Sequence, residues 1–157
     1  MPYKEEFDLV CAFDVLEHID NDKLVIDRII NALKPGGGVM LSVPQHPSLW
    51  SQVDTYSHHK RRYRTGELTA KCKAAGLTIV RDTSFVFSLL PLMLIKRLSE
   101  RNNSKFDPLQ EHTLPLGVDR AFEIALDLER RLIQANVSFP IGGSRFVLAK
   151  LTADRQG

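Results

Sequence analysis

The chain has 157 residues, of which 43% are hydrophobic and 25% are charged. This size and composition are typical of one globular domain with its own core, and they exclude a disordered chain and a coiled coil. The net charge of +2 is too small to indicate a nucleic-acid partner. Cys11 and Cys72 form no metal-ligand pattern, so we expect reduced, buried thiols in a cytoplasmic protein. The longest apolar stretch, residues 85–95, is far shorter than the roughly 20 residues that span a bilayer.

Short, nearly continuous apolar runs predict three strands buried on both faces. They lie at residues 7–13, 39–43 and 77–87. A helix with Asp20 or Asn21 as its N-cap follows the first strand and ends at the PGGG sequence, residues 35–38. A second helix begins after Thr65 and ends at Gly76. The order strand, helix, strand, helix, strand predicts a parallel sheet covered by helices, with right-handed crossovers.

The pattern changes in the second half of the chain. Residues 88–101 predict an apolar helix, 102–115 a polar connection, 118–135 an amphipathic helix and 145–151 a last strand. We therefore expect a single α/β domain over residues 1–157, with a helical insertion at about residues 88–140.

Three segments together carry a resemblance to a known family. They read FDLVCAFDVLEHI at residues 7–19, ALKPGGGVMLSV at 32–43 and HHKRRYRTGELTAKCKAAG at 58–76. The chain resembles the C-terminal part of class I S-adenosylmethionine-dependent methyltransferases, in the small-molecule branch called type 11 or type 12. The resemblance implies a partial Rossmann-like fold with a mostly parallel sheet and a last strand antiparallel beside the third. It also implies S-adenosylmethionine as cofactor and a small-molecule or lipid-like methyl acceptor.

The family's opening strand and glycine-rich cofactor loop have no match here. The chain begins at what resembles the family's fourth strand, so we expect a fragment, a wrongly assigned start codon or a relic. Because half of the family's cofactor contacts are absent, we expect weak or no cofactor binding by the chain alone. Residues 7–13 would then form an exposed apolar edge, which predicts a homodimer or poor solubility.

The turn after the first strand is where the resemblance places the cofactor, outside the carboxyl ends of the strands. The cofactor-binding residues would be Phe13, Asp14, Leu16 and His18. The alternative is an ordinary turn with a helix-capping aspartate. Asp14, Glu17 and His18 form D-x-x-E-H, which resembles an E-x-x-E-H metal motif of some branches, but aspartate reaches less far. We expect no metal, and a structural or cofactor-shell role for His18.

The polar loop after the second strand is where the family binds its acceptor. An oxygen acceptor needs a base with a pKa near neutral, so the catalytic candidates are His46, His58 and His59. The substrate-binding candidates are Trp50, Tyr56, Arg61, Arg62 and Tyr63. Arg61 and Arg62 belong to a basic cluster that could bind an anionic substrate. The alternatives are surface histidines and a solvated basic segment.

Two further functions remain open from the sequence. The chain could be a non-catalytic remnant or interaction module that keeps the helices of the fold without its chemistry. Less strongly, the basic cluster is compatible with a nucleic-acid-binding or RNA-modifying protein.

Overall fold

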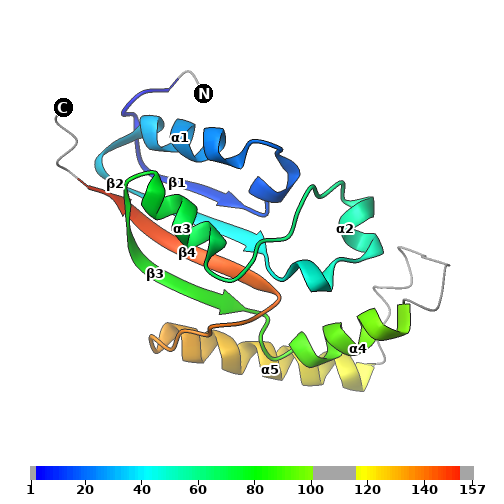
Figure 1. Cartoon of the computed structure of the whole chain (residues 1–157). Coiled ribbons are helices and arrows are strands. Elements are labelled where there is room, and N and C mark those ends of the chain that lie inside the picture. The colour runs from blue at the N-terminus through cyan, green and yellow to red at the C-terminus, as the bar shows by residue number, and fades with distance from the viewer. Residues whose placement is uncertain (1–2, 101–115, 153–157) are drawn as a thin grey trace.

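The computed structural model describes residues 3–100 and 116–152, and it contains a four-stranded sheet in the order β1-β2-β4-β3 (Figure 1). The strands are β1 (Phe7–Phe13), β2 (Leu33–Pro44), β3 (Leu77–Phe85) and β4 (Ser144–Leu151). β1 pairs parallel with β2, and β4 lies antiparallel between β2 and β3. The predicted α/β fold with an antiparallel last strand is confirmed.

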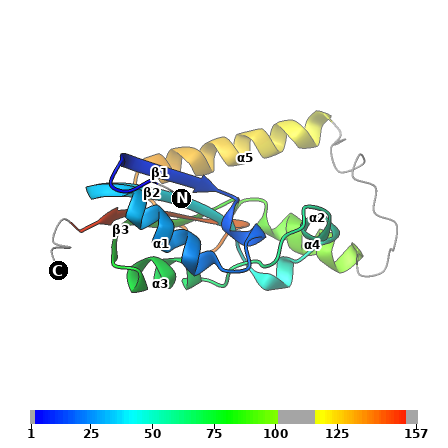
Figure 2. The same cartoon turned by 90° about the horizontal axis from the view of Figure 1, so that it is seen from above.

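Helices lie on both sides of the sheet, and Figure 2 shows the two sides separately. α1 (Asp22–Ala32) and α3 (Glu67–Ala74) cover one face, and α5 (Leu116–Gln134) lies on the other. α4 (Leu90–Glu100) follows β3. The short helices η1 (Leu16–His18), η2 (Pro47–Leu49) and α2 (Gln52–Tyr56) lie in the connections that follow β1 and β2. None of the helices in the two described ranges is both long and apolar enough to cross a membrane.

The core lies between the sheet and the α1–α3 layer. Alternate residues along a strand point to the same face, and on β2 and β4 those residues are fully buried aliphatic side chains. They are Val39, Leu41, Val43, Val147 and Ala149. The other face is less covered: Leu9 and Phe13 of β1 are about half exposed, at 48% and 52%. Since β1 pairs only with β2 in the described part of the chain, the predicted exposed apolar edge is present.

Several local predictions change in the structure. Asn21 caps α1, and its side chain accepts a hydrogen bond from the Leu24 amide. Thr65 does not cap α3: Gly66 takes the N-cap position, and the Thr65 hydroxyl instead accepts a hydrogen bond from the Gln45 side chain. Cys11 is exposed rather than buried, because it lies on the open face of the edge strand.

The PGGG sequence was predicted to end the helix before a short strand, but β2 already begins at Leu33 and includes it. A Cβ atom at Gly37 would lie 2.9 Å from the Lys34 carbonyl oxygen and 3.2 Å from that of Phe7. The glycine therefore permits the close approach of β1 and β2 at this point. Residues 101–115, which include the whole predicted polar connection and the last residue of the predicted helix before it, lie outside the described residues.

Asp22 joins the start of α1 to two other parts of the chain. Its carboxylate accepts hydrogen bonds from the Tyr63 hydroxyl, at 2.7 Å, and from the Lys71 ammonium group. Tyr63 is fully buried. Burial raises the pKa of Asp22, but the hydrogen bonds from Lys71 and Tyr63 outweigh this effect, and the pKa lies below its ordinary value. The ionised carboxylate thus fixes the segment around Tyr63 to the α1–α3 layer.

We expect Asp22→Asn to lower the free energy of unfolding at neutral pH by about 1–3 kcal/mol, because the buried Tyr63 hydroxyl and the partly exposed Lys71 ammonium group lose a charged acceptor. The folded-state pKa lies below the unfolded value, so this stabilisation is present above the unfolded pKa and is lost as the pH falls toward the folded pKa. Urea denaturation should therefore show that the difference in the free energy of unfolding between the wild type and Asp22→Asn is smaller at acidic pH than at neutral pH. As a control, Asp8→Asn breaks only the exposed pair with Lys34 and should change little.

Candidate functional site

The turn after β1 is tied to the end of β2. The Asp14 amide donates to the Ser42 carbonyl oxygen at 3.1 Å, and the Ser42 hydroxyl donates to the Asp14 carboxylate at 3.1 Å. Asp14 has a φ of 50°, a left-handed conformation that is uncommon outside glycine. The contacts with Ser42 therefore hold an unusual turn and present the carboxylate at the end of the strand.

A cavity of about 460 Å³ opens beside this turn, on the α5 side of the sheet. It is lined by Phe13, Asp14, Ser42, Thr83, Phe85, Ile133 and Phe146. We call it the Asp14 chamber. It is mostly apolar, with a few polar groups, which is typical of small-molecule sites. It also lies at the carboxyl ends of β1, β2 and β3, the rim where open α/β sheets bind ligands.

A second group of side chains meets beside η1. Glu17, His18 and His59 each offer one ligand atom, and these atoms lie within 4.8 Å of one another. The rings of His18 and His59 meet edge to face, with centroids 4.7 Å apart. Glu17 is fully buried, and neither carboxylate oxygen has a hydrogen-bond partner among the described residues. Burial raises the pKa of Glu17 above its ordinary value.

The donor set of this cluster suits a divalent cation. One carboxylate and two imidazoles are ligands that Zn²⁺ and related metals prefer. The partnerless Glu17 oxygens are buried acceptors that a cation would satisfy. Glu17, His18 and His59 are therefore the residues that could hold a metal, and His59 was not part of the D-x-x-E-H pattern.

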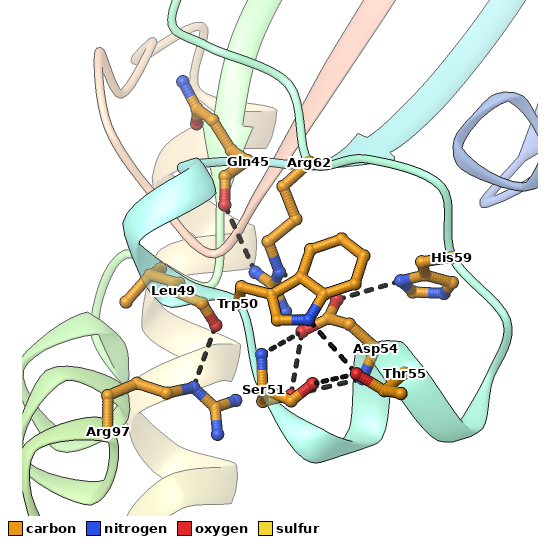
Figure 3. A network of polar contacts seen from close by, with 9 residues as sticks. All are labelled: Gln45, Leu49, Trp50, Ser51, Asp54, Thr55, His59, Arg62 and Arg97. Atoms are coloured by element: carbon orange, nitrogen blue, oxygen red, sulfur yellow. Dashed lines mark hydrogen bonds and ion pairs between the residues drawn. The ribbon is translucent and has the colours of Figure 1, made fainter. Parts of the chain in front are cut away.

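The loop after β2 is organised around the buried carboxylate of Asp54 (Figure 3). Ser51 and Asp54 form a capping box at the start of α2, in which each side chain accepts a hydrogen bond from the other's backbone. Asp54 also accepts from His59 Nδ1 at 2.9 Å and from Arg62 Nε at 2.8 Å. Burial raises the pKa of Asp54, but the bonds from Arg62 and Ser51 outweigh this effect, and the pKa falls below its ordinary value.

Arg61 and Arg62 of the predicted basic cluster make contacts with other groups of the chain. Arg61 donates to the backbone oxygens of Ile19 and Asp20, at 3.0 and 2.7 Å. Arg62 pairs with Asp54, and Tyr63 is part of the core. A sequence pattern cannot distinguish such internal contacts from a solvated anion site, because both use the same residue types.

Of the three candidate histidines, only His59 joins the Glu17 and Asp54 groups. His58 is exposed, and His46 is half-buried, with no partner for its Nε2 atom within the described ranges. Burial and the nearby Arg62 lower the pKa of His46, which keeps its imidazole neutral at neutral pH.

The remaining predicted residues divide between the surface and the core. Trp50 is 39% exposed and its indole N–H donates to the Thr55 hydroxyl, while Tyr56 is 65% exposed. Leu16 is fully buried, so its side chain is not available to a ligand. Phe13 and Asp14 line the chamber, whereas His18 lies in the Glu17 cluster.

Comparisons with known proteins agree with this architecture. The model of the family described as "Methyltransferase domain" matches residues 2–82, just over half of the chain. The mitochondrial ubiquinone biosynthesis O-methyltransferase of Dictyostelium discoideum is 45% identical over 38 residues, which is 24% of this chain and 12% of that protein. The ubiquinone biosynthesis O-methyltransferase of Hydrogenovibrio crunogenus is 27% identical over 112 residues, which is 63% of this chain and 46% of that protein.

A crystal structure of an S-adenosylmethionine-dependent methyltransferase from Archaeoglobus fulgidus shares the fold. The TM-score is 0.52 at 16% identity, and the match covers 94% of this chain and 60% of that one. The chain thus spans less than half the length of the two relatives named above. The family match over just over half of the chain leads to one conclusion: the chain belongs to the family described as "Methyltransferase domain".

Proposed function

We propose that this chain forms the acceptor side of a methyltransferase that transfers a methyl group from S-adenosylmethionine to a small or lipid-like acceptor. The observation that carries the proposal is the Asp14 chamber, a largely apolar cavity with one carboxylate at the carboxyl-end rim of the sheet. Family membership supports the same reaction. The ubiquinone biosynthesis enzymes among its relatives are O-methyltransferases, which favours an oxygen acceptor.

S-adenosylmethionine supplies an electrophilic methyl group, so the protein's own task is to align the acceptor and receive its proton. In the reaction the acceptor oxygen forms a bond to the methyl carbon while the carbon–sulfur bond breaks, and the hydroxyl proton passes to a base. Phe13 and Asp14 would contact the cofactor, and the apolar walls of the chamber would orient the acceptor. Alignment of this kind supplies much of the rate enhancement in a direct displacement.

His59 is the proposed proton acceptor. Its Nδ1 atom is bound to a buried carboxylate, which orients the ring and leaves the second nitrogen for chemistry. His58 is exposed, and among the described residues His46 Nε2 has no hydrogen-bond partner, so neither ring is oriented by a carboxylate as His59 is.

We expect His59→Gln to lower the methylation rate of a phenolic or other hydroxyl acceptor by about 10²- to 10⁴-fold, the usual contribution of a general base. Cofactor affinity should stay unchanged. The measurement is release of S-adenosylhomocysteine by the protein with the family's glycine-rich cofactor segment supplied, alongside calorimetry of the same protein with S-adenosylmethionine. The neighbouring His58→Gln is the matched control and should keep the wild-type rate. Equal rates in the two variants would contradict the role of His59.

A divalent cation at Glu17, His18 and His59 is a second candidate role for the same cluster, favoured by the unsatisfied Glu17 carboxylate. When bound there, such a cation would act as a Lewis acid on an acceptor oxygen. We expect calorimetry with Zn²⁺ alone to give one site, weakened at least tenfold (on the order of a ligand-shell loss) by Glu17→Gln. His58→Gln should bind as the wild type does. Identical binding by all three proteins would remove this candidate.

The two other functions open from the sequence are separated by methyl transfer. An enzyme should methylate an acceptor once the family's glycine-rich cofactor segment is supplied, whereas a non-catalytic remnant or interaction module would show no methyl transfer, even with many acceptors. The nucleic-acid-binding function is less supported, because Arg61 and Arg62 are engaged in contacts within the chain.

A homodimer through β1 remains a proposal, supported by the exposed side chains of Phe7, Leu9 and Phe13 on the free edge strand. We expect light scattering to give twice the chain mass, and Leu9→Lys to give a monomer, because a charge on an edge strand opposes pairing. Val80→Lys, on the opposite edge strand β3, is the control and should leave the dimer intact. A monomeric wild-type protein would contradict the proposal.

A further inference from the structure

The Asp54 carboxylate receives hydrogen bonds from two separate directions. Its Oδ2 atom accepts from the Ser51 amide and hydroxyl, both at 2.8 Å. Its Oδ1 atom accepts from His59 Nδ1 at 2.9 Å and from Arg62 Nε at 2.8 Å. The side chain is 1% exposed. Four donors thus occupy a carboxylate that offers about four lone-pair sites, and its orientation is fixed.

This carboxylate is also connected to the sheet. The Nη1 atom of Arg62 donates to the carbonyl oxygen of Gln45 at 3.2 Å, and Gln45 immediately follows the end of β2. The Gln45 amide in turn donates to the Gly143 carbonyl oxygen just before β4. Asp54 in α2 and His59 in the loop after α2 are therefore connected by hydrogen bonds to the strand ends (Figure 3).

The two carboxylate oxygens of Asp54 have different partners, so the capping of α2 can be distinguished from the contact with His59. Capping α2 uses Oδ2 and the two donors of Ser51, and this alone would explain a carboxylate or amide at the position. It does not require Oδ1 to meet an imidazole. The contact with His59 is thus an additional feature, and it determines which ring nitrogen carries the proton, because an acceptor oxygen requires an N–H opposite it.

We propose that Asp54 is a positioning residue that keeps neutral His59 in the Nδ1–H tautomer, so that Nε2 carries the lone pair that receives the acceptor's proton. The role of Nε2 as proton acceptor rests on the proposed function, whereas the Nδ1–H tautomer of His59 follows from the contact with Asp54 alone. If the cluster instead holds a cation, the same nitrogen is the available ligand atom, since Nδ1 is already engaged.

The test is a long-range ¹H–¹⁵N correlation spectrum of the full chain with ¹⁵N-labelled histidine, at a pH where the imidazoles are neutral. His59 is assigned as the signal lost in His59→Gln. We expect the wild type to show His59 as the Nδ1–H tautomer. Ser51→Ala should keep it, because this variant weakens the cap and leaves Oδ1 in place. Asp54→Ala should shift His59 toward the Nε2–H tautomer.

Two results would overturn the inference. One is a wild-type spectrum with His59 as Nε2–H, which needs no variant to fold. The other is a folded Asp54→Ala protein with an unchanged tautomer. In a methylation assay, Asp54→Ala should lower kcat by about 10²- to 10⁴-fold with little change in KM, as loss of an oriented base does, whereas Ser51→Ala should not. Absence of methyl transfer by the wild type with the family's glycine-rich cofactor segment supplied would reject the proposed function, and the spectrum would still decide the tautomer.

Discussion

Two buried carboxylates, Asp22 and Asp54, hold the loop after β2 against the rest of the molecule, and the candidate site depends on them. Asp22 binds Tyr63 from the α1 side, and Asp54 binds His59 and Arg62 from the α2 side. Removing one partner of such a buried charged network leaves the other charge uncompensated, which is costly. The segment that carries the proposed base is therefore fixed by charge pairing as well as by apolar packing.

Glu17 is a third buried carboxylate, and it is not part of this charge pairing. It is as deeply buried as the two aspartates, yet its carboxylate lacks their compensating donors within the described structure. A buried unsatisfied polar group costs roughly 1–3 kcal/mol. Such a group lowers stability unless a ligand completes its contacts, and it lies within 4.8 Å of both His18 and His59. This combination of cost and location distinguishes the cluster from an ordinary surface group of acids and histidines.

Much of the fold follows from local sequence. The apolar runs at β1 and β3 and the Asn21 cap are local signals, and they locate the elements to within a few residues. The start of β2 was mispredicted because proline and glycines normally end an element, whereas here Gly37 enables close strand contact. The position of Asp14 at the sheet rim could be predicted, because Asp14 immediately follows an apolar run that forms a strand.

The rest of the site depends on contacts between distant parts of the chain. Ser51 and Asp54 match the spacing of a capping box, but the sequence does not show that the same carboxylate also meets His59 and Arg62. Glu17 precedes α1 in the sequence and His59 follows β2, so only the folded chain brings the two side chains together. The arginines were assigned to an anion site because sequence alone does not reveal an internal partner.

Because β1 pairs with a strand on one side only in the described structure, this wall of the Asp14 chamber has fewer hydrogen bonds that resist local opening. The strand is hydrogen-bonded to β2 alone in the described structure, and Gly37 maintains that close contact at one end while Ser42 and Asp14 maintain it at the other. β2 and β4 each have two neighbours and should exchange their amide hydrogens later. β3, like β1, pairs on one side only, so local opening is expected at both edges of the sheet, and opening at β1 would displace Phe13 and Asp14 together. The wall proposed for the cofactor is consequently less firmly anchored than the part of the chamber that β2 and β4 form.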